Sequence, residues 1–116
     1  MTLAFLLAAT CLKGSLYGVC LYDQGTLIGF SRLVGDGVLY FYIADVVISP
    51  TYKGKGHGSL LVEAIMKYIN THAQTGATVA LLPAPGLEGF YGQFGFTPCP
   101  NQFFGQGLSL VVGHAI

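Results

Sequence analysis

Apolar and polar positions along the chain follow two periods, which together predict a mixed succession of strands and helices. Runs rich in β-branched and aromatic residues occupy residues 16–22, 26–34, 38–48 and 78–82, and such runs are typical of buried strands. Turn-forming residues separate the first three runs, at Asp23-Gln24-Gly25 and at Gly35-Asp36-Gly37. These three runs therefore predict an antiparallel meander.

A helical period replaces the strand pattern over residues 59–71. Its apolar positions are Leu60, Leu61, Ala64, Ile65, Tyr68 and Ile69, and Glu63 lies four residues before Lys67. Because a helix joins them, the strands at 38–48 and 78–82 are expected to be parallel. Beyond the break at residues 83–86, the pattern predicts a short helix through Tyr91 and a final pair of strands at 96–99 and 107–112.

The apolar segment at residues 3–11 permits two interpretations. It resembles the hydrophobic part of a secretion signal, but no Lys or Arg precedes it and Thr10 is a poor residue before the cysteine. A core helix ending at Lys13-Gly14 is favoured instead. No run approaches the roughly 18 apolar residues of a membrane span, so no membrane partner is expected.

Composition limits the classes of partner. The 116 residues suit one compact domain, taken as residues 1–116. Only 9% of the residues are charged, against about 25% in ordinary domains, so apolar surface is expected to meet a partner subunit in a homodimer. The formal net charge is zero, which argues against a nucleic-acid partner.

Cysteine and histidine spacing predicts no metal site. Cys11, Cys20 and Cys99 contain no CxxC pair, and the three histidines are scattered along the chain. Reduced thiols in a cytoplasmic protein are the simplest interpretation.

The stretch from Asp45 to Leu61, DVVISPTYKGKGHGSLL, carries the clearest chemical pattern. Ser49-Pro50 stops the strand, and Gly54, Gly56 and Gly58 then alternate with Lys55 and His57 before a helix expected from Ser59. Such a loop brings peptide N–H groups and a helix N-terminus to one anion, with side-chain charge from Lys53, Lys55 and His57. The alternative is a plain connecting turn. The spacing fits neither GxxxxGK[ST] nor GxGxxG.

Two motifs resemble the GNAT superfamily of N-acetyltransferases. Lys53-Gly54-Lys55-Gly56-His57-Gly58 is similar to its acyl-CoA loop, with lysine in place of Arg or Gln. The segment GFYGQFGF, residues 89–96, resembles its Phe-Tyr-x-x-x-Gly-Phe motif, most closely in amine acetyltransferases of the arylalkylamine type.

This resemblance implies a mixed α/β (α+β) fold. Helices would flank a mostly antiparallel, twisted sheet, in which the parallel strands at 38–48 and 78–82 splay apart. The implied activity is acetyl-CoA-dependent transfer of an acetyl group to a primary amine of a small molecule, by direct attack. The implied cosubstrate-binding residues are Val46, Val47, Ile48, Lys53, Gly54, Lys55, Gly56, His57, Gly58 and Ser59.

The resemblance also assigns Tyr91 as the general acid, whereas simple aromatic packing is the alternative role. The general base stays open. Asp45 either faces the substrate or pairs with Arg32, and ordered water near Tyr40 or Tyr42 is a further choice. An aromatic acceptor pocket formed by Phe30, Tyr40, Phe41 and Tyr42 and ordinary packing of these residues explain the sequence equally well.

In one respect the chain departs from the family pattern, because the resemblance places the family's first strand and helix before residue 1. The strand at 16–22 would then have an unpaired edge that a partner subunit could cover. A shortened chain also leaves the alternative of a non-catalytic acyl-CoA-binding module. A further alternative, which uses only the glycine loop, is a phosphate- or nucleotide-binding protein unrelated to acetyl transfer.

Overall fold

The computed structural model describes residues 13–113, and these form two compact units that divide after Leu82. The helix predicted at residues 3–11 lies outside the described residues. Each unit is described separately below.

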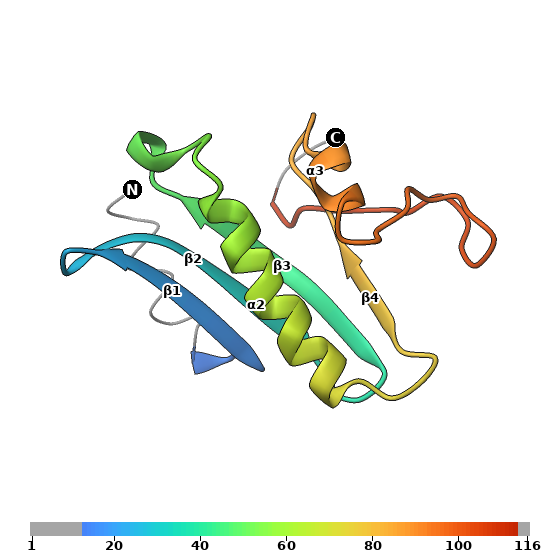
Figure 1. Cartoon of the computed structure of the whole chain (residues 1–116). Coiled ribbons are helices and arrows are strands. Elements are labelled where there is room, and N and C mark those ends of the chain that lie inside the picture. Colours follow the sequence, from blue (N-terminus) through green and yellow to red (C-terminus); the bar gives the residue numbers. More distant parts are fainter. Residues whose placement is uncertain (1–12, 114–116) are drawn as a thin grey trace. The chain divides into compact units, whose positions relative to one another are not determined.

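The first unit contains a four-stranded mixed sheet in the order β1-β2-β3-β4. Strands β1 (Tyr17–Asp23), β2 (Thr26–Gly35) and β3 (Tyr40–Ile48) form an antiparallel meander, and β4 (Thr78–Leu81) pairs with β3 in parallel (Figure 1). The predicted meander and the predicted parallel pair are both confirmed. The meander is antiparallel because short turns connect its strands. The pair β3–β4 is parallel because a helix connects the two strands.

One long helix, α2 (His57–His72), packs on a face of this sheet over β1, β2 and β3 (Figure 1). Its buried residues, Leu61, Val62, Ile65 and Ile69, recur at the helical period. They form a core with sheet residues that include Ile28, Leu33, Phe41 and Ile43. Burial of each such side chain contributes about 1.5–3 kcal/mol, so the α2–sheet layer holds this unit together.

The turn between β2 and β3 explains why β3 begins at Tyr40 instead of residue 38. Asp36 Oδ1 accepts hydrogen bonds from the backbone N–H groups of Val38, Leu39 and Tyr40, at 2.8, 2.9 and 3.0 Å. These bonds, led by the one from Tyr40, hold the pKa of Asp36 below its ordinary value. Gly35 has a φ of +144°, and a Cβ there would lie 2.0 Å from the carbonyl oxygen of Tyr40, so only glycine fits.

The second unit contains the short helix α3 (Glu88–Gly92), as predicted, followed by turns. The predicted strands at 96–99 and 107–112 are wrong, because neither segment is a strand in the described part of the chain. Pro98 and Pro100 have no N–H to donate to a ladder. Asn101 Oδ1 then accepts from the N–H groups of Phe103 and Phe104, at 2.9 and 3.1 Å, which bends the chain between the two predicted strands.

No helix within residues 13–113 is long and apolar enough to cross a bilayer.

Candidate functional site

The carboxyl-terminal half of β3 has a strand on only one side. Pairing with β4 runs from Tyr40 to Ile43, whereas pairing with β2 continues to Ile48. Among the described residues, Val46, Val47 and Ile48 therefore pair with β2 alone. Their edge toward β4 offers peptide N–H and C=O groups to a ligand.

A loop with open space beside its glycines connects β3 to α2. The N–H of Ser49 donates to the carbonyl of Ile28 at 2.7 Å, and the 3₁₀ turn η1 (Pro50–Tyr52) follows. Gly54 and Gly56 have φ values of +77° and +85°, a conformation that other residues adopt only with strain. A Cβ built on either glycine would meet no atom of the described residues within 4 Å, so these residues leave open space beside the loop.

The loop ends at the N-terminus of α2, which begins at His57, two residues before the predicted start. Its N-cap is Gly56, which has no side chain to accept a hydrogen bond, and the first turn contains no acidic residue. The first N–H groups of a helix have no intrahelical partner, and the helix dipole favours negative charge at this end. With the exposed Lys53 and Lys55 nearby in sequence, this end of α2 is suited to a diphosphate.

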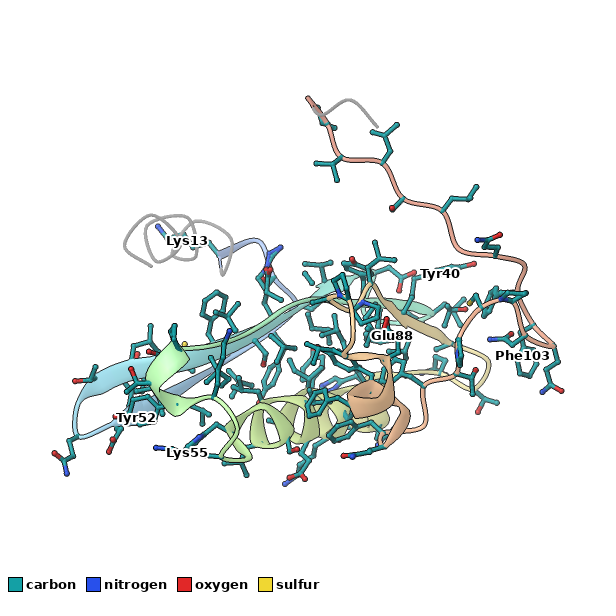
Figure 2. The ribbon with its side chains drawn as sticks, turned by 90° about the horizontal axis from the view of Figure 1, so that it is seen from above. Lys13, Tyr40, Tyr52, Lys55, Glu88 and Phe103 are labelled. Carbon is teal, nitrogen blue, oxygen red and sulfur yellow. The ribbon has the colours of Figure 1, made fainter. Side chains whose placement is uncertain are left out.

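Tyr52 contributes a cluster of contacts that the sequence analysis missed. Its hydroxyl donates to Asp23 Oδ2 at 2.5 Å, across 29 residues of sequence. The ring of His57 lies edge-on to the Tyr52 ring with centroids 5.7 Å apart, and Lys55 Nζ lies 5.9 Å from the Tyr52 centroid. Figure 2 shows Tyr52 and Lys55 in the loop that precedes α2. The hydrogen bond to Asp23, the main cause, raises the pKa of the Tyr52 phenol.

Asp45 forms the ion pair that was one of its two predicted roles. Its Oδ2 lies 3.3 Å from Arg32 Nε, and the two residues are opposite each other in the β2–β3 register. The Arg32 side chain is 15% exposed and that of Asp45 is 45% exposed, so the carboxylate remains accessible to solvent.

Among the aromatic residues considered for an acceptor pocket, Phe30 and Phe41 are buried, which favours the packing role for those two.

Tyr91 lies on α3 in the second unit and is 8% exposed. Its ring makes edge-on contacts with Phe90 and Phe96, at centroid separations of 5.0 and 6.3 Å. Burial raises the pKa of its phenol above the ordinary value of 10.0, so the group keeps its proton at neutral pH. Packing and proton donation are compatible at this residue.

Among the described residues there is no group of three or more His, Cys, Asp or Glu side chains that could hold a metal ion.

Comparison with known proteins identifies the family. Residues 6–112 match the family model of the acetyltransferase (GNAT) domain. The chain therefore belongs to the GNAT superfamily of acetyltransferases, and the resemblance found in the sequence is confirmed.

Relatives and solved structures agree with this assignment. Serotonin N-acetyltransferase 2, chloroplastic, of Oryza sativa subsp. japonica is 31% identical over 84 residues, which cover 72% of this chain and 41% of the relative. An uncharacterized N-acetyltransferase of Gracilaria tenuistipitata var. liui is 35% identical over 88 residues, or 73% and 47% of the two chains. The chain thus spans less than half the length of these two curated relatives.

A probable acetyltransferase from meticillin-resistant Staphylococcus aureus has a similar structure, with a TM-score of 0.78 and 34% identity. The match covers 90% of this chain and 79% of the other. A GNAT-family protein from Streptococcus pneumoniae, at 24% identity, shares the fold with a TM-score of 0.75 over 94% of this chain and 80% of its own.

Proposed function

We propose that this protein is an acetyl-CoA-dependent N-acetyltransferase that transfers an acetyl group to a primary amine of a small molecule, by direct attack of the amine. One observation carries the proposal. The edge of β3 that β4 leaves unpaired, at residues 46–48, is followed by the glycine loop (residues 53–58), which has open space beside it. The N-terminus of α2, which has no side-chain cap, comes directly after this loop. An elongated ligand with amides at one end and a diphosphate at the other suits this arrangement.

Two groups of residues would hold acetyl-CoA. The backbone of Val46, Val47 and Ile48 would pair with the amides of the pantetheine arm, as an added strand does. The N–H groups from Gly54 to Ser59, including Gly58, would bind the diphosphate, and Lys53, Lys55 and His57 would supply positive charge. The open space at Gly54 and Gly56 supports this assignment, since no atom of residues 13–113 lies within 4 Å of a Cβ built on either glycine.

Acetyl-CoA would supply the activated thioester, and three proton transfers must accompany the reaction: two protons leave the amine nitrogen and one reaches the thiolate. An alkyl amine has a pKa near 10 and must lose a proton before it attacks. Ordered water near Tyr42 or the half-exposed Asp45 would take that proton. A peptide N–H on the free part of β3 would donate to the thioester carbonyl oxygen. Tyr91, protonated at neutral pH, would give a proton to the departing thiolate, and the second proton that the nitrogen loses as the amide forms would restore the phenol.

The amine acceptor, the assembly and the location are parts of the same proposal. The rice relative is named for serotonin, which supports a small amine as the acceptor.

We also propose a homodimer, supported by exposed apolar side chains in the segment 103–112. The free thiols of Cys20 and Cys99 accord with the cytoplasm as the location.

Calorimetric titration of the protein with acetyl-CoA tests the proposal, with 3′-dephospho-CoA and ATP as comparison ligands. We expect saturable binding of acetyl-CoA, followed by release of free thiol when a panel of primary amines is added. Binding with no turnover on any amine would instead identify the non-catalytic acyl-CoA-binding module. A folded sample that binds no acetyl-CoA at millimolar concentration would overturn both.

A further inference from the structure

The loop between β3 and α2 has few hydrogen bonds of its own. Within it, the N–H of Tyr52 donates to Ser49 and that of Lys53 to Pro50, at 2.9 and 3.3 Å. Gly54 and Gly56 follow, and no atom in the described part of the chain lies within 4 Å of a Cβ built on either of them. Glycines increase the conformational freedom of a free loop, so an ordered anion site here needs support from outside the loop.

Tyr52 supplies such support in two directions. Its hydroxyl donates to Asp23, the last residue of β1, which immediately precedes the turn into β2. Its carbonyl oxygen lies 3.3 Å from His57 Nδ1, at the first residue of α2, and its ring contacts the His57 ring edge-on. Tyr52 thus connects the sheet to the helix N-terminus across the glycine loop.

The contacts of Tyr52 also place two charged side chains, Asp23 and Lys55, beside the glycine loop. Asp23 is an anion near a site expected to bind phosphate, and its bond to the phenol engages one carboxylate oxygen. Lys55 Nζ lies 5.9 Å from the Tyr52 ring centroid, within the range of a cation–π contact. The ring therefore favours a position of the lysine ammonium next to the loop.

From these contacts we infer that Tyr52 is a positioning residue for cosubstrate binding, whose bond to Asp23 preorganises the glycine loop for the diphosphate of acetyl-CoA. This inference rests on the proposed function. Preorganisation lowers the entropy that binding must remove, so its loss weakens affinity without changing the chemical step.

The test compares four variants with the wild-type protein: Tyr52→Phe, Asp23→Ala, Asp23→Asn and Tyr22→Phe. Tyr52→Phe and Asp23→Ala each remove the bond, and we expect a rise in the Kd and KM for acetyl-CoA on the order of tenfold. The kcat at saturating acetyl-CoA should stay within about twofold. Asp23→Asn retains an acceptor oxygen and should restore part of the affinity. Tyr22→Phe, which alters an exposed tyrosine of the same hairpin, should change nothing.

Amide hydrogen exchange in the unliganded protein gives a second readout that does not depend on acetyl-CoA. We expect faster exchange at residues 53–59 in Tyr52→Phe, with β2 and the centre of α2 unchanged. If the wild-type protein binds acetyl-CoA and Tyr52→Phe binds it equally well, the inference is wrong while the proposed function stands. If the wild-type protein does not bind acetyl-CoA, both are overturned.

Discussion

Tyr91 combines a buried ring with a phenol that keeps its proton. The ring contacts with Phe90 and Phe96 account for its place in α3, and burial raises the pKa of the phenol above 10.0. A general acid must be protonated at the working pH, and the phenol of Tyr91 meets this condition at neutral pH. The protonation state needed for the proposed donation to a thiolate is therefore present.

We predict that Tyr91→Phe lowers kcat about a hundredfold and leaves the Kd for acetyl-CoA unchanged, since only the hydroxyl is removed. The wild-type kcat should show no loss from deprotonation of this residue until the pH exceeds 10.0, because the folded-state pKa is raised. Steady-state rates and calorimetry check this, with Tyr22→Phe as the control. If kcat is unchanged in Tyr91→Phe, Tyr91 is a packing residue and not the general acid.

The pair formed by Arg32 and Asp45 leads us to expect a structural role for the carboxylate. Asp45→Asn keeps the shape but removes the countercharge of a guanidinium whose side chain is only 15% exposed. We predict a loss of about 1–2 kcal/mol in the free energy of unfolding, with kcat within tenfold of wild type. Urea denaturation and turnover measure the two effects. A hundredfold fall in kcat at unchanged stability would identify Asp45 as the general base.

At the scale of elements, the start of α2 should be sensitive to a negative charge while the far end of the helix is not. Gly56→Asp places a carboxylate where the diphosphate is proposed to bind, so we predict at least a tenfold rise in the Kd for acetyl-CoA. Gly76→Asp is a matched control, because Gly76 follows α2, has a φ of +89° and also has open space around it. Calorimetry should show that Gly76→Asp binds acetyl-CoA normally. Equal losses in both variants would mean that backbone strain, and not the anion site, is responsible.

The elements themselves could mostly be predicted, because the forces that form them act locally. Period and turn residues predicted β1, β2 and α2 to within a few residues, and the glycine loop was predicted from its glycines together with the strand before it and the helix after it. The bond between Tyr52 and Asp23 could not be predicted in this way. Asp23 was identified only as a turn residue and Tyr52 only as part of the stretch that contains the loop, and the folded chain brings them together across 29 residues of sequence. The contact between Arg32 and Asp45 was one of two open choices, since it depends on register.

At the scale of the whole molecule, the segment 107–112 shows the limit of pattern-based prediction. Its run of apolar and β-branched residues is typical of a strand, yet a strand exists only where a second one pairs with it. Leu108 is 93% exposed and Val112 is 88% exposed, and no strand pairs with this segment in residues 13–113. Apolar exposure on this scale is unusual for a monomer and suits a surface that another subunit covers.

The final prediction concerns that surface. Light scattering after size exclusion should give a mass near that of two 12.3 kDa chains. Leu108→Glu combined with Leu110→Glu should shift the protein toward monomer, because burying two carboxylates in an apolar interface is costly. Leu87→Glu, at another exposed leucine of the same unit, should leave the mass unchanged. A wild-type protein that stays monomeric at high concentration would contradict the proposed homodimer. A dimer that survives the double substitution would place its interface on another surface.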